Sequence, residues 1–215
     1  MDVADIEELA RQNYNAIDDS YFSAAEIYRL IYRAQRELAV KANCIERTYT
    51  TTSTSGTSEY SFPTNAFALR LVEYNSVPLQ KVTERERYSV SLASASATVT
   101  GTPKFFSIWN RTIKLTPTPD TSSITIRLHT YNFPQTVTLS STLEVPAEFQ
   151  DGIVDYILRF MYAKDGNIAM SRDYQARWDQ TVADAVIWNA RRKRANGPAQ
   201  VQSEDILEGT ILGIV

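Results

Sequence analysis

Cysteine and histidine are almost missing from this 215-residue chain, which contains one of each. A single cysteine, Cys44, cannot form a disulfide or a cysteine cluster within the chain, so we expect a buried structural thiol. The single histidine, His129, excludes a multi-histidine metal site within one chain. Because His129 lies in an alternating, strand-like segment, we interpret it as a surface histidine rather than a general base.

Clustered glycines, long apolar runs and an excess of positive charge are also lacking. The seven glycines are spread along the chain and form no phosphate-binding loop. No stretch approaches the roughly eighteen apolar residues of a membrane helix, and the acidic start MDVADIEELARQ does not resemble a signal peptide. The net charge of −3 gives no general attraction for nucleic acid. We therefore expect no membrane partner, and folding in a reducing cytoplasm.

Neighbouring carboxylates occur at Asp18 with Asp19 and at Glu84 with Glu86, in turn-like or charged segments. Solvated carboxylates explain both pairs better than a catalytic dyad does. Combined with the scarcity of histidine and cysteine, this leads us to predict no catalytic residues, no cofactor and no metal site. We therefore predict that the protein is not an enzyme.

The strongest positive pattern is the segment 22–45, FSAAEIYRLIYRAQRELAVKANCI, which predicts a long amphipathic helix. Ser23 and Glu26 have the spacing of a capping box. Apolar residues then recur at the three- and four-residue spacing of one buried face, namely Ile27, Leu30, Ile31, Ala34, Leu38 and Ala42. Such a helix needs a packing partner, and no comparable pattern follows before Pro146. We therefore expect it to pack against helices from the C-terminal part of the chain.

Weaker helical patterns cover residues 3–15 and the chain from Pro146 to about Ala195. Between residues 46 and 144, Thr, Tyr and alternating apolar residues predict about seven strands in a small sandwich or barrel. The first two of these strands are expected to form a hairpin around Gly56, although a low-complexity linker is the alternative there. The segment 83–97 is compatible with a helix, a loop or an edge strand.

These patterns predict an α+β fold in which a helical bundle carries an inserted, mainly antiparallel β domain. We assign residues 1–45 and 146–196 to the bundle, 46–145 to the β domain, and 197–215 to an extended C-terminal tail.

Four consecutive cations end the last predicted helix: Arg191, Arg192, Lys193 and Arg194. Cations at a helix C-terminus complement the helix dipole and stay solvated, which is the simpler interpretation. Four of them exceed what capping requires, so contact with DNA in a channel or with an acidic partner is the alternative.

The tail after Pro198 is strongly apolar at six positions: Ile206, Leu207, Ile211, Leu212, Ile214 and Val215. Burying six such side chains contributes roughly 9–18 kcal/mol. Ordering about fifteen residues costs on the order of 15–25 kcal/mol, so burial alone does not hold the tail in place. The tail therefore needs backbone pairing as well, such as the addition of a strand to a sheet edge. Its own bundle and another subunit are both open as partners.

Several segments, taken in order, resemble one protein family. They are EIYRLIYRAQREL, GTSEYSFPTNAFALRLVEYNSVPLQ, GTPKFFSIWNRTIKLTPTPD, IRLHTYNFP, VPAEFQDGIVDYILRFMYAKDGN and RDYQARWDQ. With these segments the chain resembles the head-to-tail adaptor (connector) proteins of tailed bacteriophages, including the tail tubular protein A type. The resemblance spans about residues 20–185.

This resemblance implies a structural virion protein at the head–tail junction, assembled in the host cytoplasm. It implies a homo-oligomeric ring, a dodecamer, beneath the portal protein, with the helical part facing the portal and the β part facing tail or nozzle subunits. DNA would pass through the lumen without sequence readout, tail fibres are a further partner, and the apolar tail would contact the portal or a neighbouring subunit. The main alternative is a tail or baseplate component whose β domain binds a fibre or a receptor glycan. An enzyme with an active site in the β domain ranks third.

Overall fold

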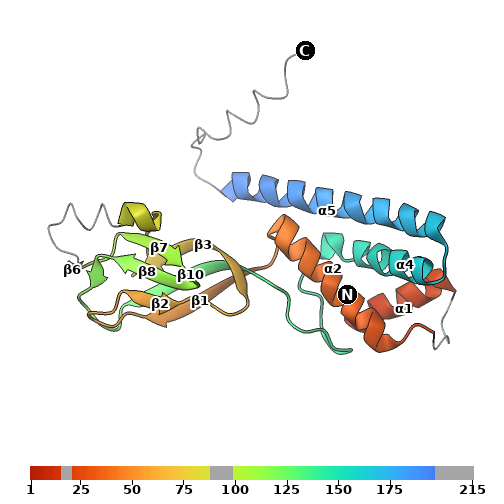
Figure 1. The fold of residues 1–215 in the computed structure, drawn as a ribbon, viewed down its shortest axis with the longest axis horizontal. Helices are drawn as coiled ribbons and strands as arrows, with labels where there is room; N and C mark the ends of the chain where they lie inside the picture. Colours follow the sequence, from red (N-terminus) through yellow and green to blue (C-terminus); the bar gives the residue numbers. More distant parts are fainter. Residues whose placement is uncertain (16–20, 88–98, 197–215) are drawn as a thin grey trace, which may run out of the picture.

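Helices from the two ends of the chain lie together in the computed structural model, which describes residues 1–15, 21–87 and 99–196 (Figure 1). They are α1 (Val3–Tyr14), α2 (Ala24–Ala42), α4 (Gly152–Lys164) and α5 (Ile168–Asn196), with a short 3-10 helix η1 (Ala147–Phe149) ahead of α4. Helix α4 packs against α1, α2 and α5, and α2 also contacts α5. The predicted closure of the N-terminal helices against the C-terminal ones is therefore confirmed.

Helix α2 begins as predicted but ends earlier. Ser23 Oγ accepts a hydrogen bond from the amide of Glu26 at 3.3 Å. The reciprocal half of the predicted capping box is replaced, because the Glu26 carboxylate instead binds Lys164 Nζ at 2.8 Å. The helix stops before Asn43, whose left-handed φ of 49° turns the chain. Cys44 therefore follows the helix rather than lying on its last turn; it is buried, and burial raises its pKa to about 11.

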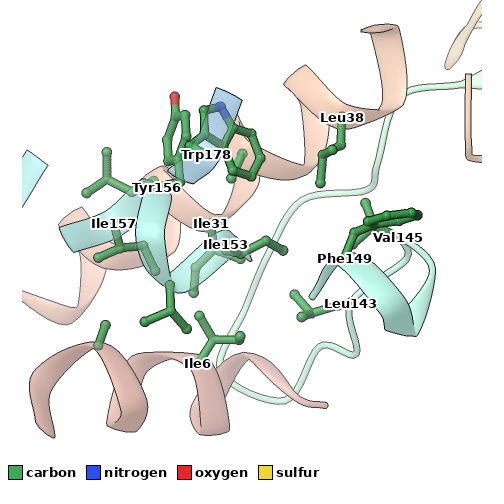
Figure 2. Packing of buried hydrophobic residues seen from close by; sticks show 14 of the residues in the cluster. Ile6, Ile31, Leu38, Leu143, Val145, Phe149, Ile153, Tyr156, Ile157 and Trp178 are labelled. Carbon is green, nitrogen blue, oxygen red and sulfur yellow. The ribbon is translucent and has the colours of Figure 1, made fainter. Parts of the chain in front are cut away.

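One large hydrophobic cluster fills the space between these helices (Figure 2). All six apolar residues predicted on the inner face of α2 are buried in it. Trp178 is completely buried, and its ring meets that of Tyr156 edge-on with centroids 4.9 Å apart. Leu143 and Val145, which lead into η1, lie in the same cluster. The helical part is therefore packed around aromatic side chains contributed by both C-terminal helices.

The middle of the chain forms two four-stranded sheets. The first has the order β1-β10-β3-β4 and the second the order β2-β8-β7-β5. The strands of the first sheet are β1 (Glu46–Thr52), β10 (Thr125–Asn132), β3 (Ala66–Tyr74) and β4 (Val77–Pro78). Those of the second are β2 (Glu59–Ser61), β8 (Thr112–Thr116), β7 (Phe105–Trp109) and β5 (Gln80–Lys81). A small parallel pair, β6 (Thr100–Gly101) with β9 (Thr118–Pro119), completes this part.

Side chains from both sheets form a second, smaller hydrophobic cluster. Its buried members are Val72, Tyr74, Leu79, Phe106, Ile113, Leu115, Ile126 and Leu128. The sheets therefore face each other as a sandwich, mostly antiparallel, with no closed barrel among the described strands. The predicted α+β class is confirmed. The exact division into domains remains a prediction.

The predicted hairpin between the first two strands is wrong. Strands β1 and β2 follow each other in sequence but belong to different sheets, β1 pairing with β10 and β2 with β8. Threonine and tyrosine favour strands without specifying a partner, so composition located the strands and not their pairing. Tight turns do occur elsewhere: Asn75–Ser76 and Asn110–Arg111 both have positive φ at two successive residues, as tight hairpin turns require.

Candidate interaction surfaces

The basic end of α5 lies against the start of β1. Arg192 Nη2 lies 2.7 Å from Glu46 Oε1, and its guanidinium carbon lies 4.9 Å from the ring centre of Trp188. The ammonium group of Lys193 lies 4.7 Å from the ring centre of Tyr131 on β10. Two of the four predicted interface cations therefore contact their own chain and help to hold α5 against the first sheet.

The remaining two cations of this run have different surroundings. Arg191 is exposed on α5, whereas Arg192 and Lys193 are half-buried. Arg194 belongs to the helix, but its side chain lies outside the described residues. Contact of the run with DNA or with an acidic partner stays a prediction, and Arg191 is the most exposed of the three described side chains.

Asn189 joins the same end of α5 to the end of α2. Its side chain is buried, and its Nδ2 donates a hydrogen bond to the carbonyl oxygen of Ala42 at 2.6 Å. The last carbonyl groups of a helix have no partner within that helix, so this bond satisfies one of them. The end of α2, the start of β1 and the end of α5 consequently meet at one place.

Strand β1 is an edge strand, and within the described residues β10 is its one ladder partner. Hydrogen bonds just outside the strand define its orientation. The amide of Asn132 donates to the Ile45 carbonyl at 2.9 Å, and the amide of Ser53 donates to the Ile124 carbonyl at 2.8 Å. In an antiparallel ladder, bonded and non-bonded pairs alternate. The odd-numbered residues of β1 therefore direct their backbone groups toward β10.

The even-numbered residues of β1 direct their backbone groups the other way. The N–H and C=O groups of Thr48, Thr50 and Thr52 consequently point to the free edge of the first sheet. A groove of about 750 Å³ lies next to this edge, between β1 and the edge strand β2 of the second sheet. Its lining is rich in hydroxyl groups and includes Tyr49, Thr50, Thr51, Thr57, Tyr60, Ser61 and Leu128.

Sequence reasoning missed this groove, because its walls come from two strands that the sequence placed in one hairpin. The sequence signal for it is the threonine-rich run of β1. With so few apolar side chains, this strand cannot be fully covered by the second sheet. The six apolar tail residues predicted as an interface lie outside the described residues, as do Asp18 and Asp19. Their roles remain predictions.

An acidic groove of about 500 Å³ was also missed; it lies among α1, α4 and α5. Glu148, Asp151, Asp155 and Asp184 contribute its carboxylates. Burial raises the pKa of Asp155, and Asp151 raises it further, while the charge of Arg177 opposes them. These acids come from separate elements, so only the spacing of Asp151 and Asp155 by one helical turn was visible in the sequence.

His129 is half-buried on β10 and lies close to side chains of both neighbouring strands. Its Nδ1 lies 3.0 Å from Thr48 Oγ1 on β1, and its Nε2 lies 3.3 Å from Glu73 Oε1 on β3. The ring therefore bridges three strands of the first sheet. It is more enclosed than the surface histidine that we expected, because its neighbours come from both sides of β10.

Glu84 is not the solvated carboxylate that the sequence predicted. Arg87 binds it in a bidentate manner at 2.8 and 3.0 Å. The hydroxyl of the buried Ser107 donates to it at 2.7 Å, and Lys114 Nζ lies 3.5 Å away. These hydrogen bonds, that of Arg87 foremost, outweigh the effect of burial and lower the pKa of Glu84 to about 2. The three partners come from a helical turn and two strands, so their convergence could not be read from sequence spacing.

The described residues contain no group of three or more His, Cys, Asp or Glu side chains arranged to hold a metal ion. Within those same residues, every helix is too short or too polar to cross a membrane. The absence of a metal, a cofactor and a membrane partner from the whole protein remains a prediction.

Comparison with protein families gives a match over most of the chain. The family model described as "SU10 adaptor protein" matches residues 1–202, which include every residue that the structure describes. No curated protein gives a significant match to the chain. The matched region ends before the apolar positions 206–215 of the tail.

Proposed function

Because the chain belongs to the SU10 adaptor protein family, we propose that copies of it form a ring that joins the portal of a phage head to the tail. Family membership confirms the predicted resemblance to phage head-to-tail adaptors and supports a structural role in the virion. The finer features of this role, namely the ring, its partners and the passage of DNA, belong to the proposal.

The observation that carries the proposal is the family match across both structural parts of the chain. In the assembly we propose, the helical part faces the portal and the sandwich faces tail or nozzle subunits. This assignment gives each partner a separate part of the chain, since the helices and the sandwich have distinct hydrophobic clusters. We propose a dodecamer, with tail fibres as a further partner.

DNA passage is the second component of the proposal. Arg191 is exposed on α5, and the basic run to which it belongs would meet phosphates in a lumen without reading sequence. Such contacts weaken steeply with salt, because they depend on the release of counterions. No catalytic step is part of the proposed role.

The test is assembly with the portal and tail proteins of the same phage. Purified protein is mixed with each of them, and the complexes are examined by sedimentation and by electron cryo-microscopy. We expect ring-shaped density between portal and tail. A protein that bound neither partner would contradict the proposal.

A further inference from the structure

The free edge of β1 has the features of a strand-accepting surface. Seven consecutive residue pairs join β1 to β10 without a register shift, so the outer edge is long and regular. Thr48, Thr50 and Thr52 present their backbone donors and acceptors there. Unpaired backbone groups on such an edge provide a template for an additional strand.

This edge lacks the usual protection against pairing. Natural edge strands are blunted by lysine, proline, bulges or short length. Strand β1 contains neither lysine nor proline, and its TYTTT portion carries no charge. The register shifts of the first sheet lie between β10 and β3, on the opposite side of β10. The edge is therefore suited to a partner rather than to solvent.

The neighbouring groove adds room for side chains. Tyr49 and Leu128 on the first sheet, with Tyr60 on the second, supply apolar surface within a rim of hydroxyl groups. A strand added to β1 would place every second side chain toward the gap between the two sheets. An occupant with apolar, β-branched residues would then bury part of its surface.

The C-terminal segment of the chain has this chemistry, and the helix that precedes it in the sequence contacts the start of β1. Residues 206–215, ILEGTILGIV, are mostly apolar and contain four β-branched aliphatic side chains and one threonine. Arg192, four residues before the end of α5, is bound to Glu46, the first residue of β1. A linker of about nine residues spans at most roughly 30 Å, so the segment is able to reach a β1 strand close to that junction.

We propose that the segment 206–215 of one copy adds as a strand to the free edge of β1 in a second copy. Backbone pairing supplies the stabilisation that apolar burial alone does not give to this segment. The inference rests on the proposed assembly of the chain into a ring. It deepens that proposal by assigning the contact between neighbours to two defined surfaces.

A second copy is the occupant we favour because the exchange closes a ring. Each copy donates one segment and offers one edge, which is the head-to-tail arrangement that generates closed rings. A segment bound to its own β1 would protect the edge but would join no subunits. In the closed ring, the modest contacts between all neighbouring subunits act together and stabilise the assembly.

Two variants with opposite defects test the exchange. One chain lacks residues 203–215 and keeps its edge, and the other carries Thr50→Pro and keeps its C-terminal segment. Proline at position 50 removes a backbone N–H that points to the free edge and leaves the ladder to β10 intact. We expect full-length protein to assemble and each variant alone to fall to the mass of one chain in light-scattering chromatography. Mixed together, the two variants should form a complex of one copy of each.

Matched controls distinguish the loss of the edge N–H from the loss of the threonine side chain and from unfolding. Thr50→Ala keeps the N–H and should assemble like the unmodified protein. Thr52→Pro, at the next outward-facing position, should repeat the effect of Thr50→Pro, and thermal melting of each chain checks that the fold persists.

Three results would overturn the inference. They are a full-length protein that stays monomeric, assembly that survives both variants, and variants that fail to complement each other although each is folded. Failure to complement, with reduced stability of the truncated chain, would mean that the segment pairs with its own β1. Assembly that survives truncation while portal binding is lost would assign the segment to the portal instead. Neither of these results contradicts the adaptor role, which fails only if the full-length protein binds neither portal nor tail protein.

Discussion

The helical part and the sandwich bury their apolar side chains in different ways. The helices surround a broad cluster with buried tryptophan, tyrosine and phenylalanine rings at its centre. The sandwich has a smaller cluster, which also contains the aromatic residues Tyr74 and Phe106, and leaves a groove between two of its edge strands. Apolar burial therefore dominates the first part, while the second depends more on strand pairing and polar contacts.

The largest expected effect is the loss of the central ring of the helical cluster. Trp178→Ala should lower the free energy of unfolding by about 3–5 kcal/mol, because it removes a fully buried ring and leaves a cavity. Trp109→Ala is the matched control, since the Trp109 side chain is 64% exposed. The control should change stability by less than about 0.5 kcal/mol. Urea unfolding measures both, and equal losses would contradict the assignment of Trp178 to the core.

A smaller effect is expected from the corresponding change in the sandwich. Ile126→Ala should cost about 2–4 kcal/mol, because Ile126 is completely buried between the sheets. If the two clusters are separate cooperative units, amide exchange in Ile126→Ala should accelerate in the strands and not in α4 or α5. Uniform acceleration throughout the protein would show that helices and sandwich unfold together. That outcome would also remove support from the predicted division into domains at residues 45 and 146.

The contrast between the two parts also explains what the sequence could predict. The helices were predictable because the apolar residues from Ile27 to Ala42 recur with the helical period, and this local pattern marks the face that is buried. Strand positions were predictable from the same kind of local signal, as the alternating segment around His129 shows for β10. Pairing was not, because Tyr49 and Tyr60 have similar strand preferences and yet belong to different sheets.

The candidate surfaces were predictable only where they lie within one segment. The basic run was visible, but the contacts of Arg192 with Glu46 join residues far apart in the sequence, and spacing carries no information about them. The groove beside β1 arises from the arrangement of two sheets, so no single stretch of sequence encodes it. The same holds for Glu84, whose three partners converge only after the strands have paired.

The junction between the two parts should respond more weakly than either core. Asn189→Ala removes the donor that satisfies the Ala42 carbonyl, and a buried acceptor left without a partner costs about 1–3 kcal/mol. Arg191→Ala is the control, because Arg191 is exposed on the same helix. We expect thermal melting to show a lower midpoint for Asn189→Ala alone. Equal melting midpoints for the two variants would show that the hydrogen bond of Asn189 does not stabilise the packing of α5 on α2.

The smallest expected effect concerns the hydrogen-bonded carboxylate of Glu84 in the sandwich. It appears as a dependence of the protein's stability on pH. The pKa of Glu84 is lowered from 4.5 to about 2 by its hydrogen bonds to Arg87 and Ser107 and by the nearby charge of Lys114. The folded state therefore binds a proton less readily than the unfolded state. This contribution to stability is fully present above pH 4.5 and is lost as the pH falls toward 2.

Glu84→Gln should consequently destabilise the protein at pH 7 by about 1 kcal/mol, after allowance for solvent screening of the pair. The difference between the variant and the unmodified protein should shrink as the pH falls from 4.5 toward 2, because protonation removes the same charge from Glu84. Urea midpoints at pH 7 and pH 3 measure this change, with Glu8→Gln as a control because Glu8 is exposed on α1 and lies outside the sandwich. A difference that stayed constant between the two pH values would mean that packing, and not charge, is what Glu84 contributes. The sandwich would then resemble the helical part more closely than the contacts around Glu84 indicate.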